Sequence, residues 1–144
     1  MYDPCAHDNE LQSIAVLRDF AKELELPDPL VAKVVHYVKA TIKHRLSPAN
    51  AGDGDLKLFL DFDLEVLGRE KEGYGRYKEE IRREYGHLSG KEYCEGRTGV
   101  LKRFLERDRL YFSEWGFNKF EVRARENLKG EIGELEGELA RNKD

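Results

Sequence analysis

The sequence lacks the features that would cross-link a fold through disulfides or metal ions or insert it into a membrane. Two of its 144 residues are cysteine, Cys5 and Cys94, and their spacing matches neither a metal-binding motif nor a disulfide framework. No apolar run approaches the roughly 20 residues that a membrane span needs. The first residues lack the basic and apolar segments of a signal peptide. These absences predict a reduced, cytoplasmic protein with no membrane partner.

Charge is abundant and nearly balanced. Charged residues make up 38% of the chain, which is typical of long solvated helix faces, and the formal net charge is −4. A negative net charge argues against a nucleic-acid partner that is recognised through a general positive field. The length suits one ordinary domain. We therefore predict a single helical domain over residues 1–144, with a frayed tail over residues 136–144.

Apolar residues recur three and four positions apart through most of the chain, a spacing that is typical of helices. Six helices and no strand are expected, which makes the fold class all-α. The first helix follows Asp8 as its N-cap, and the second starts with Asp28 as its cap. The third and fourth span about residues 55–67 and 69–85. A capping box at Ser89 and Glu92 opens the fifth, and Ser113 caps the sixth, which runs towards residue 139.

The predicted third helix is apolar over most of its circumference and should therefore lie centrally in the core. Phe62 is accordingly expected to point inward. Asp61 and Asp63 are the unusual charges on it. A buried carboxylate is costly unless it is paired or binds a cation. Two residues apart on a helix, the two side chains point in different directions, so one of them at most is expected to face a given site. That both are satisfied or exposed charges is equally open.

A second group of polar candidates lies at the ends of the first two helices. His44 follows Lys43 and precedes Arg45, and histidine is the commonest metal ligand, although a helix-ending surface residue is the simpler interpretation. Lys43 and Arg45 could attract phosphate or be ordinary surface charges. Glu10 fits the first turn of a helix. No glycine-rich phosphate loop and no Ser/His/Asp signature is present.

Taken together, several short motifs resemble one branch of the HD-domain superfamily, whose members are helical, metal-dependent phosphohydrolases. The resemblance covers nearly the whole chain, and its motifs are jointly more specific than any one of them. They are Tyr2-Asp3-Pro4, Asn9-Glu10, Thr41 with His44, Leu60-Asp61-Phe62-Asp63-Leu64 with Leu67-Gly68, Glu84-Tyr85, Gly96-Arg97, and Glu121 with Ala124, Arg125, Asn127 and Leu128.

The resemblance implies a set of roles for these residues. The family builds its metal site from an early His, an adjacent His-Asp doublet and a late Asp, and Asp63 matches that late Asp, with Asp61 as the alternative. Glu10 and His44 would orient groups or transfer protons, and Lys43 and Arg45 would contact phosphate. The implied cofactor is a divalent metal ion (Mn, Mg, Zn, Fe or Co), and the implied substrate is a phosphorylated small molecule or nucleotide.

The chain also departs from the family pattern. His7-Asp8 follows the Tyr-Asp-Pro turn, whereas the family's doublet precedes it. The helices that carry the early His and the doublet are therefore expected to be missing, which leaves Asp63 alone of the core metal set. One carboxylate does not hold a divalent cation, so we expect weak or no activity and no bound cofactor. The alternative is a non-catalytic helical scaffold that associates as a homodimer or larger species through the first three helices.

Overall fold

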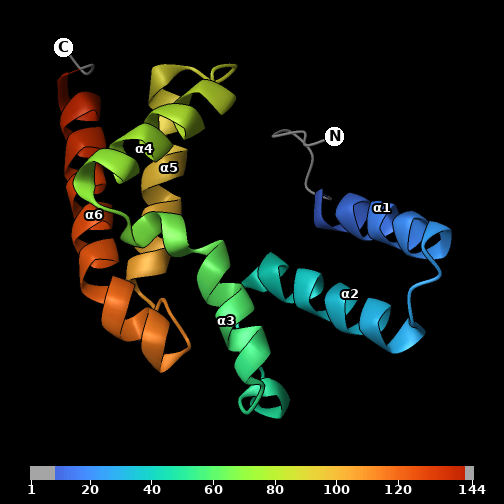
Figure 1. The fold of residues 1–144 in the computed structure, drawn as a ribbon. Coiled ribbons are helices and arrows are strands. Elements are labelled where there is room, and N and C mark those ends of the chain that lie inside the picture. Colours follow the sequence, from blue (N-terminus) through green and yellow to red (C-terminus); the bar gives the residue numbers. More distant parts are fainter. Residues whose placement is uncertain (1–8, 142–144) are drawn as a thin grey trace. The chain divides into compact units, whose positions relative to one another are not determined.

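The computed structural model describes residues 9–141, and these residues form helices and no strand. The all-α prediction is confirmed (Figure 1). The expectations for Cys5, for His7 and for Asp8 as an N-cap lie outside the described residues. No helix within residues 9–141 has the length and apolar character needed to cross a membrane. The α-helices are α1 (Asn9–Glu23), α2 (Asp28–Lys43), α3 (Gly54–Asp63), α4 (Lys71–Glu84), α5 (Gly90–Leu105) and α6 (Glu114–Arg141), with short 3-10 helices η1 (Pro48–Asn50) and η2 (Glu65–Gly68).

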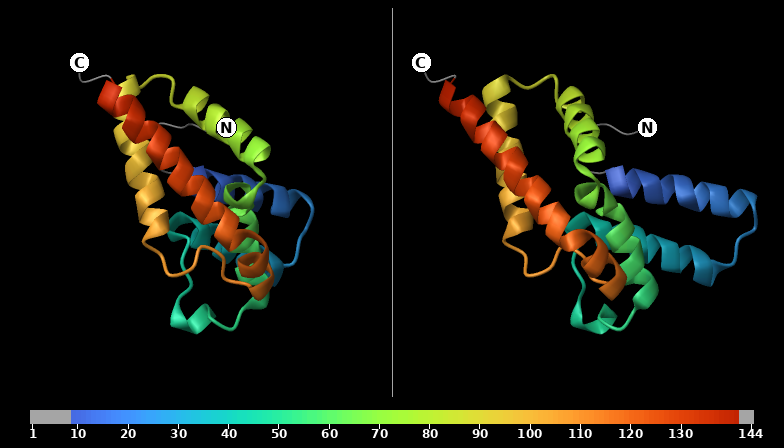
Figure 2. Two further views of the ribbon diagram at one scale, coloured as in Figure 1. Left: turned by 90° about the vertical axis from the view of Figure 1, so that its left-hand side faces the viewer. Right: turned by 60° about the vertical axis from the view of Figure 1, so that its left-hand side comes forward.

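The chain divides into two compact units, and the boundary falls inside α3, between Leu60 and Asp61. In unit 1, which ends at Leu60, α1 and α2 form an antiparallel hairpin that is clearest in Figure 2. Ile14 and Ala21 of α1 and Val35 of α2 are buried. The hairpin turn starts α2 one residue earlier than expected, because Pro27 takes the N-cap position and Asp28 is already helical.

Asp53 joins α2 to the start of α3. One of its carboxylate oxygens accepts a hydrogen bond from the N–H of Leu56 at 3.0 Å, and the hydroxyl of Tyr37 donates to the same carboxylate at 3.1 Å. The Leu56 N–H is the main reason that the pKa of Asp53 lies below its ordinary value. The loop over residues 47–54 can be predicted from Pro48, Gly52 and Gly54, which disfavour a helix, whereas Asp53 as its capping residue cannot.

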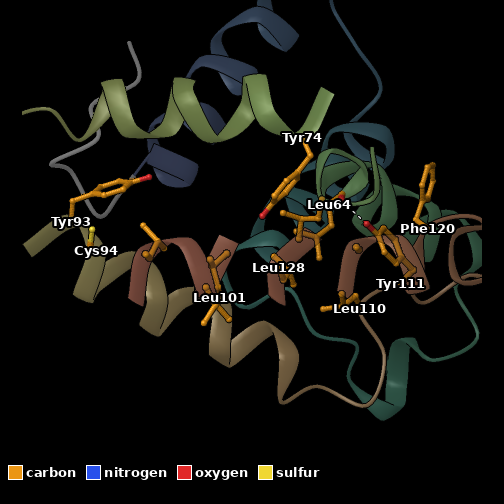
Figure 3. Close-up of a cluster of buried hydrophobic side chains, with 13 residues drawn as sticks. Leu64, Tyr74, Tyr93, Cys94, Leu101, Leu110, Tyr111, Phe120 and Leu128 are labelled. Atoms are coloured by element: carbon orange, nitrogen blue, oxygen red, sulfur yellow. Dashed lines mark hydrogen bonds between the residues drawn. The ribbon is translucent and has the colours of Figure 1, made fainter. Parts of the chain in front are cut away.

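Unit 2, which begins at Asp61, is built from η2, α4, α5 and α6 around one apolar core. Figure 3 shows this core, in which the Tyr111 hydroxyl donates to the carbonyl of Leu64 at 2.8 Å. The predicted capping box of Ser89 and Glu92 is present at the start of α5. At the start of α6 the Ser113 hydroxyl oxygen accepts from the N–H of Gly116 at 2.9 Å, which confirms Ser113 as the N-cap. The fully buried core residues include Cys94, Leu101, Leu110, Tyr111, Ala124 and Leu128.

Two expectations for the third helix are wrong. It ends at Asp63 rather than at residue 67, and η2 follows it. This tight turn brings Gly68 so close to α6 that a Cβ there would lie 2.6 Å from the Cβ of Phe120. Phe62, expected inside the core, is 60% exposed and meets the edge of the Trp115 ring at a centroid distance of 5.8 Å. The apolar pattern therefore identifies the helix correctly but not which of its sides is covered.

A glycine pair on α6 tests the packing of unit 2. A Cβ on Gly116 would lie 2.3 Å from an oxygen of Asp61, whereas a Cβ on Gly130 would meet nothing within 4 Å. We expect Gly116→Ala to lower the free energy of unfolding by about 2 kcal/mol or more, since the carboxylate must move. Gly130→Ala, the matched control, should raise it by about 0.5–1 kcal/mol because alanine favours a helix. Urea unfolding followed by circular dichroism measures both, and equal effects would contradict the packing.

Candidate functional site

Asp61 is a buried carboxylate whose two oxygens are both occupied by its own unit. It is fully buried. Its oxygens accept hydrogen bonds from the N–H of Phe112 at 2.6 Å, from the N–H of Ser113 at 2.9 Å and from the Ser113 hydroxyl. The carboxylate also lies at the N-terminus of α6, where the helix dipole favours negative charge. Asp61 therefore ties the end of α3 to the start of α6.

Glu121 likewise accepts backbone hydrogen bonds, from the residues that precede Phe112 in the segment between α5 and α6. Its carboxylate accepts from the N–H of Leu110 at 2.9 Å and from the N–H of Tyr111 at 3.2 Å. It also pairs with Arg125 at 2.7 Å. Arg125 in turn donates to the carbonyls of Leu105 and Arg107, at 3.1 and 2.6 Å. The residues between the two helices are thus held by side chains from α3 and α6.

Asp63, the residue favoured as a metal ligand, is exposed and is the last residue of α3. Its neighbour Asp61, the alternative ligand, is committed to the backbone of α6. The two aspartates therefore divide their roles: one is structural, and the other presents its carboxylate at the surface. Sequence spacing shows that the two side chains diverge, but it does not show which of them is buried.

The remaining predicted site residues belong to unit 1. His44 is buried, takes the left-handed conformation with φ 45° and ends α2, and its N–H donates to the carbonyl of Ala40 at 2.9 Å. Lys43 and Arg45 on either side of it are exposed. Glu10 is half-buried in the first turn of α1. Because α1 and α2 run antiparallel (Figure 2), the start of α1, where Glu10 lies, and the end of α2, where His44 lies, are at the same end of the hairpin.

A third buried carboxylate, Glu131, was missed by sequence reasoning. It accepts a hydrogen bond from the Tyr74 hydroxyl and pairs with the guanidinium of Arg97 at 2.8 Å. Burial and this contact raise the pKa of Tyr74 far above its ordinary value, so the phenol stays protonated. A sequence pattern could have pointed to Glu131. Glu131, Glu134 and Glu138 recur along one side of α6, and Lys78 and Arg82 recur along one side of α4. In the structure Lys78 pairs with Glu134, and Arg82 pairs with Glu138.

A hollow of about 400 Å³ opens between α4 and α6 beside this network. Its charged side chains are of both signs and largely neutralise one another, since Arg123 pairs with Glu70 at 2.9 Å and Lys78 pairs with Glu134. Within residues 9–141, no three side chains of the His, Cys, Asp and Glu types gather in a way that could hold a metal ion.

Comparison of the chain with models of known protein families, with curated proteins and with solved structures gave no match. The structure by itself defines the class of protein as all-α, with buried carboxylates that accept hydrogen bonds from backbone N–H groups next to helix ends. The HD-domain relationship stays a prediction from the motifs.

The two aspartates of α3 should respond differently to the same substitution. Asp61→Asn removes a charge that accepts three hydrogen bonds in a dry site and places an amide against backbone donors. We expect it to lower the free energy of unfolding by about 2–4 kcal/mol. Asp63→Asn should change it by less than about 1 kcal/mol, as for an exposed charged side chain. Denaturant titration of both variants measures this, and a larger loss for Asp63→Asn would contradict the assignment.

Proposed function

We propose that the chain is a helical domain of the HD phosphohydrolase type, in which Asp63 is a metal-ligating carboxylate. Its substrate would be a phosphorylated small molecule or nucleotide in the cytoplasm. The observation that supports this most is the division between Asp61 and Asp63. The motif resemblance singles out Asp63, and Asp63 is the member of the pair that faces solvent.

The buried carboxylate of Asp61 helps to position the exposed carboxylate of Asp63 as a ligand. Asp61 fixes the last turn of α3 through its contacts with Phe112 and Ser113. The backbone two residues further on is thereby held, which limits the positions of the Asp63 side chain. A carboxylate oxygen is a suitable ligand for Mg²⁺ or Mn²⁺. When bound, such an ion would supply an activated water for phosphoester hydrolysis.

The motif resemblance also proposes roles for four residues of the α1–α2 hairpin in unit 1. Glu10, in the first turn of α1, and His44, at the end of α2, are suited by their residue types to orient groups or to transfer a proton. Lys43 and Arg45 flank His44 and are suited to attract a phosphate by charge. A divalent cation needs several ligands, and Asp63 supplies one of them. The chain by itself should therefore bind metal weakly and hydrolyse phosphoesters slowly or not at all.

Titration with Mn²⁺ tests the role of Asp63. We expect binding no tighter than that of a surface carboxylate cluster, and weaker still in Asp63→Asn. The matched control is Asp108→Asn, an exposed aspartate of the same unit, which should leave Mn²⁺ binding and the slow hydrolysis of p-nitrophenyl phosphate unchanged. Calorimetry and relaxation of water protons measure the binding. Tight, stoichiometric Mn²⁺ that survives Asp63→Asn would refute this role.

A second candidate function, self-association, is favoured by the outer face of α1. Val16, Phe20 and Leu24 follow one another at intervals of four residues, and they are 65%, 53% and 55% exposed. Four-residue spacing places them on one side of the helix. Exposed apolar surface costs about 25 cal/mol for each Å². A two-fold pair of chains is the commonest way to cover such a face.

Sedimentation of the purified chain tests this second function. We expect a dimer or larger species at micromolar concentration, with contacts from the first three helices and with α6 outside the contact. Phe20→Glu should shift the protein to monomer because it places a charge in the apolar face. Val122→Glu, at an apolar position of α6 that is 73% exposed, is the matched control and should leave the assembly intact. A wild-type monomer would show that this face is not used for self-association.

A further inference from the structure

A second hollow, of about 410 Å³, lies wholly within unit 1 between α1 and α2. Small apolar side chains of α2 line it, among them Val31, Ala32 and Val35. Arg18 of α1 and His36 and Lys39 of α2 also line it and supply its basic groups. The groove therefore combines an apolar strip with basic groups from both helices.

Within residues 9–141, the two cations of this groove form no ion pair. Neither Arg18 nor Lys39 forms an ion pair with any residue in the described part of the chain, whereas Lys33 of the same helix pairs with Asp55 at 2.8 Å. The groove's acidic lining residue is Asp28, the first residue of α2. Lys39 lies about three turns further along that helix. Lys39 is thus well separated from Asp28 along α2.

His36 adds a hydrogen-bond donor beside these cations. Its Nε2 lies 3.3 Å from the side-chain nitrogen of Asn50. An amide nitrogen donates and does not accept, so Nε2 is the acceptor. In the neutral ring with this tautomer the proton is on Nδ1, so the ring keeps one N–H as a hydrogen-bond donor. Two cations without an ion-pair partner among the described residues, together with a neutral donor, match the charge and the acceptor oxygens of a phosphate.

We propose that the α1–α2 groove is a binding site for an organic phosphate monoester. Its phosphate contacts Arg18, His36 and Lys39, and its apolar or aromatic group covers Val31 and Val35. The volume accommodates a ligand of that kind, because small-molecule sites are mostly apolar clefts of about 300–1,000 Å³ with a few polar groups that fix orientation. This site is separate from the metal role of Asp63 and does not depend on it.

Amide NMR of the isotope-labelled chain with 1-naphthyl phosphate, in the presence of EDTA, tests the site. We expect saturable shifts confined to amides of α1 and α2 around the groove. Inorganic phosphate carries the charge alone and 1-naphthol carries the ring alone, so each should bind at least about fivefold more weakly than the ester. Shifts elsewhere, no saturable shifts, or equal binding of 1-naphthol would overturn the proposal.

Two substitutions locate the phosphate. Arg18→Gln and Lys39→Gln should each weaken 1-naphthyl phosphate binding roughly threefold, as expected for one exposed charge contact. Lys22→Gln removes the same charge one turn from Arg18, outside the groove, and should leave the affinity unchanged. An equal loss in Lys22→Gln would mean general charge attraction and would overturn the site. Asp63→Asn should have no effect on this binding, so a failure here is distinguishable from a failure of the metal role.

Discussion

Two buried carboxylates hold the corner between α5 and α6, and the rest of unit 2 depends on them. Asp61 and Glu121 together accept hydrogen bonds from four successive backbone N–H groups, those of residues 110–113. Leu110 and Tyr111 are fully buried, so water cannot take the place of these acceptors. A buried N–H left without a partner costs about 1–3 kcal/mol. The irregular corner can therefore be packed inside the unit only while both carboxylates are in place.

This constraint decides which acidic groups are available for chemistry. The Asp61 carboxylate is used in contacts that stabilise the fold. The same is true of Glu121, which pairs with Arg125, and of Glu131, which pairs with Arg97. A carboxylate that accepts several internal hydrogen bonds has little capacity left for a ligand. The proposed functions accordingly rest on groups at the surface, namely Asp63 in unit 2 and the polar end and basic groove of the hairpin in unit 1.

Local sequence signals predicted the helices well, and they failed where the determining partner is distant along the chain. The capping box at Ser89 and the cap at Ser113 are contained within four residues, so both could be read directly. Asp61 accepts hydrogen bonds from Phe112 and Ser113, which lie about fifty residues further along the chain, and no local sequence pattern predicts these contacts. The same holds for Tyr74 and Glu131. Burial of Phe62 was predicted from the apolar pattern around its helix, but the exposure of a side chain depends on which face another helix covers.

Hydrogen exchange at the α5–α6 corner tests the central claim most directly. Residues 110–113 precede α6 and are not helical, and amides in such segments ordinarily exchange quickly unless they are bonded and buried. If Asp61 and Glu121 bind them as described, the amides of these four residues will be protected to nearly the same degree as those in the middle of α6. Fast exchange at all four, with α6 itself still protected, would contradict the account.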